Sequence, residues 1–312
     1  MRPPEPRPGD DEPEAHAPAV WRAAGVELSC RPRTLVMGIL NVTPDSFSDG
    51  GRFLNSQAAV AQGLRMIDEG ADLIDVGGES TRPGARDVDA EEEARRVVGV
   101  IERLAKESGR VPISVDTRKA AVAAAALDAG AAIVNDVSGG FDPLLLKAVR
   151  AAGAGYVLMH MRGTPATMQE FAAYADAVED VRSELALRLA ALDEAGIAED
   201  HVVVDPGIGF AKTAGQSLLL LRRIEAFSQL GRPVLVGPSR KSFIGRVLGA
   251  DVDDRLEGTL ATVAWLVAKG VPIIRVHDVR VAVRVCRMVE AIRDAEPDAE
   301  PAEPVEPPGA GR

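Results

Sequence analysis

The sequence is poor in cysteine and contains no long apolar run. Its two cysteines, Cys30 and Cys286, are too few for a disulfide framework or a cysteine-based metal cluster. No stretch of about 18 apolar residues occurs, so no segment is a candidate for spanning a membrane. The N-terminal residues MRPPEPRPGDDEPEAHAP lack the apolar segment of a secretory signal. We therefore expect a cytoplasmic protein with no membrane partner.

An excess of positive charge is also lacking, since 36 Lys and Arg stand against 47 Asp and Glu and the formal net charge is −11. This balance argues against a nucleic-acid partner. Residues 1–20 hold five acids and two arginines, and residues 294–312 hold six acids and one arginine. Both segments are rich in Pro, Glu and Ala, a composition that buries too little apolar surface to offset the entropy lost on ordering. The sequence thus predicts disordered tails at residues 1–30 and 294–312, around a single domain at residues 31–293.

Within this domain the chain repeats one unit, in which a helix-like pattern ends in Gly and a short apolar strand follows. The repeats read EGADLIDVGG, SGRVPISVD, AGAAIVND, AGAGYVLMH, LGRPVLVG and KGVPIIRVH. Gly stops a helix by taking the left-handed conformation, and about five apolar, mostly β-branched residues are typical of a strand buried on both faces. With TLVMGIL and HVVVDPG, eight such strands are expected.

The segments between the strands carry helix signals. Asp89 and Glu92 fit a capping box, and Asp142 with Pro143 fits an N-cap and first helical position. Apolar residues also recur at helical spacing: Val178, Val181, Leu185, Leu189 and Leu192. Eight alternating strands and helices over about 260 residues predict an α/β fold, a (β/α)₈ TIM barrel. A doubly wound open sheet stays the alternative, because periodicity does not show closure.

Nearly every predicted strand ends in a polar or ionisable side chain. In chain order these ends carry Asn41, GGESTRPGA, Asp116, Asn135, Met159 with His160, Asp205, GPSRKSFIG, and Arg275 with His277. Active sites of such barrels lie at the carboxyl ends of the strands. The strand starts carry little beyond Asp72 and His201, and we interpret His201 as an ordinary residue at the start of a strand.

Two kinds of chemistry are mixed at these strand ends. Asp116, Asn135 and Asp205 suit a flat heterocycle with several N–H donors, such as a pterin or guanine, because a carboxylate accepts two parallel N–H bonds. Asp116 could equally cap the following helix. A second set consists of cations beside serines and glycines, which is typical of a phosphate site. Its members are Arg82, Lys241, Arg275 and His277.

Together these motifs resemble the dihydropteroate synthases of the folate pathway. The segments that carry the resemblance are NVTPDSFSDGG, DVGGESTRPGA, ISVDT, VNDVSGG, DPGIGF, SRKSFIG and RVHDV. They extend in order from about Thr34 to Ile292, so only the tails lie outside them. The resemblance implies a transferase that joins 6-hydroxymethyl-7,8-dihydropterin diphosphate to p-aminobenzoate, releasing 7,8-dihydropteroate and pyrophosphate.

The resemblance also implies roles for single residues. The pterin would be held by Asp116, Asn135, Asp205 and Lys241, with Met159 on its face. The diphosphate would be held by Asn41, Arg82, Arg275 and His277, with Mg²⁺ bound between it and Asn41. Ser242, at a helix start, would receive the p-aminobenzoate carboxylate in a pocket built with Phe47 and Pro83, and Thr81 is a further substrate contact. The expected catalytic residues are Asn41, Arg82, Lys241, Arg275 and His277.

The implied chemistry is cleavage of the C–O bond to diphosphate. Cations and Mg²⁺ would stabilise the leaving group while the dihydropterin shares the positive charge on its methylene, so we expect a dissociative, SN1-like substitution. The loop from Asn41 to Gly51 would close over the diphosphate and exclude water. His160 is expected to satisfy a neighbouring backbone group, and no substrate contact is assigned to residues 161–175.

Two rival interpretations stay open. A non-catalytic pterin-binding relative would keep the pocket, although the intact NVTPDSFSDGG and SRKSFIG argue against it. A barrel methyltransferase acting on methyltetrahydrofolate would share the pterin carboxylates, but it would have no use for Arg82, Arg275 and His277. The resemblance further implies a homodimer, formed here through EGTLATVAWLVAKG and the helix after His277. Sensitivity to sulfonamides, which resemble p-aminobenzoate, is also expected, because the loop around Phe47 and Pro83 has no obvious insertion.

Overall fold

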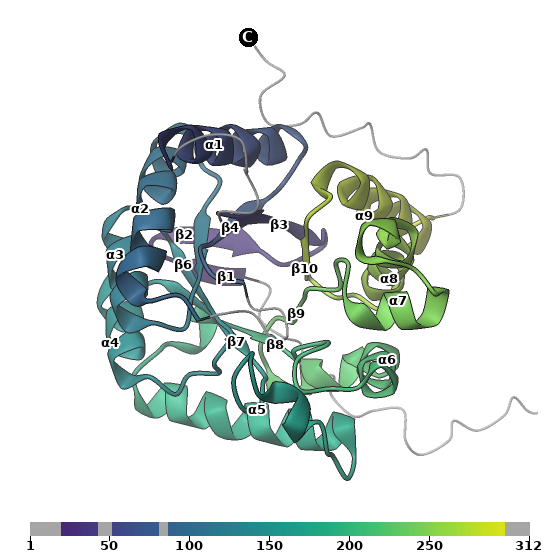
Figure 1. The fold of residues 1–312 in the computed structure, drawn as a ribbon. Coiled ribbons are helices and arrows are strands. Elements are labelled where there is room, and N and C mark those ends of the chain that lie inside the picture. Colours follow the sequence, from purple (N-terminus) through teal and green to yellow (C-terminus); the bar gives the residue numbers. More distant parts are fainter. Residues whose placement is uncertain (1–19, 43–51, 81–86, 297–312) are drawn as a thin grey trace, which may run out of the picture.

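A closed barrel of eight parallel strands forms the centre of the protein (Figure 1). The computed structural model describes residues 20–42, 52–80 and 87–296. The strands are β3 (Leu35–Asn41), β4 (Leu73–Gly77), β5 (Ile113–Asp116), β6 (Ile133–Asp136), β7 (Gly155–Met159), β8 (Val202–Asp205), β9 (Leu235–Val236) and β10 (Ile273–Val276). They pair in the order β8-β7-β6-β5-β4-β3-β10-β9, and a parallel bridge between Val204 and Val234 joins β8 to the β9 segment. The (β/α)₈ prediction is confirmed, and the open-sheet alternative is wrong.

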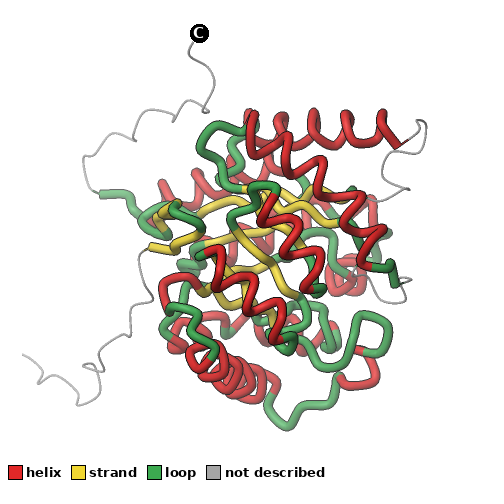
Figure 2. The backbone as a smooth tube through the Cα atoms, turned by 90° about the vertical axis from the view of Figure 1, so that its left-hand side faces the viewer, coloured by secondary structure: helices red, strands yellow, loops and turns green. Residues whose placement is uncertain are grey.

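Helices surround this barrel, as two perpendicular views show (Figure 1, Figure 2). They are α1 (Arg52–Asp68), α2 (Ala90–Glu107), α3 (Ala120–Asp128), α4 (Pro143–Ala152), α5 (Ala177–Glu194), α6 (Ala214–Arg222), α7 (Ser242–Leu248), α8 (Leu256–Ala268) and α9 (Val279–Arg293). Asp89 caps α2 by accepting a bond from the Glu92 amide, 2.8 Å, and Asp142 caps α4 with Pro143 following. The apolar stripe of α5 is buried, as predicted. None of the helices in the described ranges is long and apolar enough to cross a membrane.

Alternation along the strands divides the core in two. In β3, Val36 and Leu40 pack in the cluster shared with the helices, whereas Leu35 and Met37 belong to the cluster inside the barrel. Successive side chains of a strand point to opposite faces, and both faces are apolar here because helices cover the outside. This explains why the strands appear in the sequence as continuous apolar runs.

A hairpin before the first barrel strand corrects the predicted domain boundary. Strands β1 (Val20–Ala23) and β2 (Val26–Ser29) pair antiparallel through a two-residue turn in which Ala24 and Gly25 have φ of 47° and 81°. Trp21 is fully buried among residues of the inner cluster, and its Nε1 donates to the carbonyl of His201, 2.9 Å. The predicted tail at residues 1–30 is therefore wrong for residues 20–30, since a buried indole contributes a large apolar contact area.

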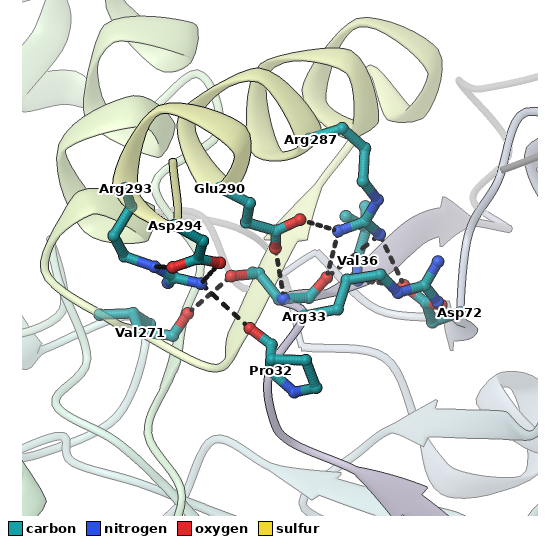
Figure 3. Close-up of polar contacts among 10 residues, drawn as sticks. Pro32, Arg33, Val36, Asp72, Val271, Arg287, Glu290, Arg293 and Asp294 are labelled. Atoms are coloured by element: carbon teal, nitrogen blue, oxygen red, sulfur yellow. Dashed lines mark hydrogen bonds and ion pairs between the residues drawn. The ribbon is translucent and has the colours of Figure 1, made fainter. Parts of the chain in front are cut away.

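A polar cluster ties the start of β3 to the last helix (Figure 3). The amide of Thr34 donates to Glu290 Oε1, 2.5 Å, and the amide of Val36 donates to Asp72 Oδ2, 2.8 Å. Arg287 pairs with the second oxygen of Glu290, 2.6 Å. These bonds join the first and last units of the barrel at the amino ends of the strands, far along the chain from each other.

Candidate active site

The carboxyl ends of neighbouring strands bring the predicted polar residues into one row. Asn41 pairs in register with Gly77, Gly77 with Asp116, and Asp116 with Asn135. Met159 and Asp205 are paired in the same way further around the barrel. Parallel strands end at the same edge of a sheet, so this register alone gathers side chains from distant parts of the sequence.

Arg275, near the end of β10, reaches carboxylates on β4 and β5. Its Nε donates to Asp75 Oδ2, 2.6 Å, and its Nη2 donates to Asp116 Oδ2, 2.7 Å. Asn135 Nδ2 donates to the same oxygen of Asp75, 2.9 Å. Asp116 makes this ion pair rather than capping the next helix, whose N-cap is Lys119. The arginine that the sequence assigned to the diphosphate thus contacts two carboxylates in the free protein.

Asp75, a fully buried residue inside β4, was not predicted as a site residue from the sequence. Its Oδ2 accepts bonds from Arg275 and Asn135, while its Oδ1 is buried with no hydrogen-bond partner among the described residues. A single carboxylate within the apolar run LIDVG was the available signal. A charged residue on a strand buried on both faces needs a partner, because an unpaired buried charge is very costly.

Burial disfavours the charged forms of the site's acids and of its lysine, which raises the pKa of the acids and lowers that of the lysine. It raises the pKa of Asp116 to about 7, with Arg275 opposing the shift. It also raises the pKa of Asp205, and here Lys241 opposes. Burial lowers the pKa of Lys241 to about 8, while Asp205 acts the other way. The site therefore holds acids that are poorly solvated, which favours a ligand that donates hydrogen bonds to them.

A tight turn after β8 forms one wall of the site. Asp205 accepts a bond from the Gly207 amide, 2.7 Å, and Lys241 Nζ donates to the carbonyl of Ile208. The same ammonium lies 4.6 Å from the centre of the Phe210 ring, a cation–π contact. Met159 belongs to a small apolar cluster with Phe210 packed against it. Phe210 was also missed, although it closes the motif DPGIGF directly after a strand end.

The loops after β9 and β10 carry the remaining assigned residues. His277 Nδ1 lies 2.9 Å from Ser239 Oγ, which also accepts from the His277 amide, 3.3 Å. Ser242 is the exposed first residue of α7. Arg240, with φ of 56°, pairs with Asp278, 2.8 Å. The structure thus brings His277 next to the serine of the SRKSFIG segment.

Several assigned residues lie outside the described part of the chain. They are Phe47, Thr81, Arg82 and Pro83, together with most of the loop from Asn41 to Gly51. One further expectation is corrected. The ring of His160 bonds two side chains, Glu184 and Lys212, rather than a backbone group. Both partners lie far from it in sequence, so no local pattern indicated them.

Comparison with known proteins gives the same picture. The sequence matches the family described as pterin binding enzyme over residues 37–277. It is 48% identical over 266 residues to dihydropteroate synthase of Bacillus subtilis (strain 168), covering 85% of this chain and 90% of that protein. The fold is similar to Xanthomonas albilineans dihydropteroate synthase with 4-aminobenzoic acid, with a TM-score of 0.83, 43% identity, and coverage of 89% and 99%. It is also similar to Yersinia pestis dihydropteroate synthase in a sulfonamide drug complex, with a TM-score of 0.83, 42% identity, and coverage of 88% and 100%. The chain therefore belongs to the dihydropteroate synthase family of pterin-binding enzymes.

Proposed function

We propose that the protein condenses 6-hydroxymethyl-7,8-dihydropterin diphosphate with p-aminobenzoate, giving 7,8-dihydropteroate and pyrophosphate. The observation that carries the proposal is the buried row of Asp116, Asn135 and Asp205 with Lys241 and Arg275 at the carboxyl end of the barrel. Family membership and a similar structure with bound 4-aminobenzoic acid support it.

The pterin would bind with its N–H edge toward the carboxylates. Asp116 and Asp205 can each accept parallel N–H bonds, and Asn135 offers an amide beside them. The apolar cluster that includes Met159 would pack on the ring. Lys241, held above Phe210, would donate to an acceptor of the heterocycle.

Mg²⁺ would be held by the substrate more than by the protein. The described residues contain no group of three or more His, Cys, Asp or Glu that could hold a metal ion. Asn41 offers one amide oxygen, which lies beside Gly77 at the end of the neighbouring strand β4. One such ligand fits Mg²⁺, which keeps several waters and binds through substrate phosphates. When bound, the ion would neutralise charge on the diphosphate.

Cationic side chains would then assist departure of the diphosphate. Arg275 at the end of β10, with His277 two residues later, would stabilise the negative charge that builds on the leaving group. The carbon–oxygen bond would break before the amine attacks, because the dihydropterin can share the positive charge left on its methylene. Ser242, exposed at the start of α7, would receive the p-aminobenzoate carboxylate.

We also propose a homodimer that works in the cytoplasm. Large apolar side chains on α8 and α9 are exposed, namely Trp265, Met288 and Ile292. Burying such side chains between two copies is favourable. Both thiols are free and buried, which fits a chain without a disulfide framework. Sedimentation equilibrium with wild type and Trp265→Asp tests the assembly, and a monomeric wild type would refute it.

Turnover is the direct test of the proposed reaction. Purified protein receives the dihydropterin diphosphate, Mg²⁺ and p-aminobenzoate, and pyrophosphate and dihydropteroate are measured together. Asp205→Asn and Arg275→Ala should abolish product formation. Asp200→Asn is the matched control, because Asp200 lies at the opposite end of the barrel beside Arg22. Pterin binding without turnover would instead support the non-catalytic relative, the first rival interpretation.

A further inference from the structure

A second row of polar side chains, Glu184, His160 and Lys212, lies behind the turn after β8. The proposed reaction does not use these side chains. His160 Nε2 lies 3.0 Å from Glu184 Oε2 of α5, and His160 Nδ1 lies 3.0 Å from Lys212 Nζ. Lys212 Nζ also donates to the carbonyl of Phe210, 2.9 Å. His160 is fully buried and Lys212 is 3% exposed, so the bond between them forms away from water, whereas Glu184 is partly exposed.

The direction of each bond in this row is fixed by chemistry. The carboxylate of Glu184 only accepts, so His160 Nε2 carries the proton and donates to it. A neutral imidazole has one N–H, so Nδ1 must accept from Lys212. Burial lowers the pKa of His160 to about 4, which keeps the ring neutral near pH 7. His160 thus orients Lys212 by accepting its hydrogen bond at Nδ1.

The backbone of the turn fits closely against this row. The amide of His160 donates to the carbonyl of Asp205, 2.8 Å. Gly207 has φ of 68°, and a Cβ there would lie 2.0 Å from the His160 carbonyl oxygen and 3.4 Å from Lys212 Nζ. A residue with a side chain could not take this place, so the turn and the row are packed as one unit.

The opposite side of the turn faces the pterin site. Its Ile208 carbonyl accepts from Lys241, and its Phe210 ring lies under the same ammonium. Lys212 bonds the carbonyl of that same Phe210. A shift of the Phe210 carbonyl would therefore move the Phe210 ring and, with it, Lys241 in the proposed pterin site.

We propose that Lys212, oriented by His160 and Glu184, is a positioning residue that holds residues 206–210 in the conformation that binds the pterin. This inference rests on the proposed function. A buried polar side chain is costly unless its hydrogen bonds are made. The two bonds of Lys212 therefore fix the position of its ammonium, and through the Phe210 carbonyl they fix the turn. Loss of Lys212 should weaken pterin binding more than it affects the p-aminobenzoate side of the site.

Three variants test the proposal by calorimetric binding of 6-hydroxymethyl-7,8-dihydropterin diphosphate without p-aminobenzoate. Lys212→Met should raise the dissociation constant by about tenfold, the effect of losing one buried hydrogen bond. His160→Leu should do the same, because it removes the side-chain acceptor that orients Lys212 and leaves only the Phe210 carbonyl. His160→Asn should remain close to wild type, since its Oδ1 can replace Nδ1. If His160 only filled space, His160→Leu should bind the pterin more tightly than His160→Asn.

Arg232→Met is the matched control, because Arg232 is a buried cation at the amino end of β9 that pairs with Glu199, 3.2 Å. It should lower the melting temperature without changing pterin affinity. Unchanged affinity in a folded Lys212→Met, or equal affinities for His160→Leu and His160→Asn, would overturn the proposal. If Lys212→Met does not fold, the two His160 variants decide. The binding assay needs no turnover, so a wild type that binds the pterin without catalysis would fail only the proposed function.

Discussion

Replacing Asp75 by Asn should impair catalysis although Asp75 reaches the site only through Arg275 and Asn135. The substitution keeps the shape but removes the charge that holds the Arg275 guanidinium, 2.6 Å away. In addition, one atom of the new amide, NH₂ or oxygen, would occupy the buried position of Asp75 Oδ1, which has no hydrogen-bond partner among the described residues. A hydrogen bond to a charged group contributes about 1.5–3 kcal/mol, which corresponds to a loss of roughly 10- to 150-fold in kcat/KM.

The assay is the rate of pyrophosphate release at several concentrations of the dihydropterin diphosphate. Asp72→Asn is the control, because Asp72 directly precedes the same strand and its carboxylate binds the Val36 amide at the amino end of the barrel. It should lower stability while kcat/KM stays within about threefold of wild type. An equal fall in kcat/KM for the two variants would refute the reasoning, since both would then act through stability alone.

Three further outcomes are expected. Trp21→Ala should lower the free energy of unfolding by about 3–5 kcal/mol in urea titrations without changing KM, because a fully buried indole is removed from the barrel end opposite the site; a loss under about 1 kcal/mol would contradict the packing role. Pterin binding at pH 7 should release protons, seen by calorimetry in buffers of different ionisation enthalpy. The sign follows because the pKa of Asp116 is about 7 in the free protein and ligand N–H donors stabilise its ionised form, so binding lowers that pKa; proton uptake, or equal release by Asp116→Asn, would contradict it. Sulfonamides should raise the apparent KM for p-aminobenzoate at unchanged kcat, and turnover that ignores the drug would show the expectation of sensitivity to be wrong.

The fold could be predicted because each unit repeats the same local physics. A glycine ends a helix, an apolar run forms a strand, and eight repeats close a barrel whose polar strand ends meet. The hairpin at residues 20–29 escaped prediction because two four-residue strands beside a Pro-rich segment give little periodicity. Its buried residues, Trp21 above all, pack against barrel residues that lie far away in the sequence.

The site could be predicted where a residue stands at the end of a strand, and much less well elsewhere. Asp116, Asn135 and Asp205 were found by this rule. Asp75 was not, because its importance depends on contacts 60 and 200 residues away. The partners of the His160 ring were missed for the same reason, since one is 24 and the other 52 residues distant. Local pattern indicates which residues share an edge, whereas pairings across the barrel require the fold.

The arrangement of Arg275 suggests why one site can recognise both halves of the proposed substrate. In the free protein its guanidinium bonds both Asp75, which also accepts from Asn135, and Asp116, a buried acid that needs a partner. A heterocycle that donates N–H bonds to Asp116 supplies that compensation instead. Arg275 then has donors available for an anion, and the diphosphate is the anion that arrives with the heterocycle. Pyrophosphate alone brings no such donors, so it would have to draw Arg275 away from Asp116 without supplying that carboxylate with new donors. Discrimination in favour of the intact pterin diphosphate would thus arise from the shared arginine as well as from the shape of the pocket.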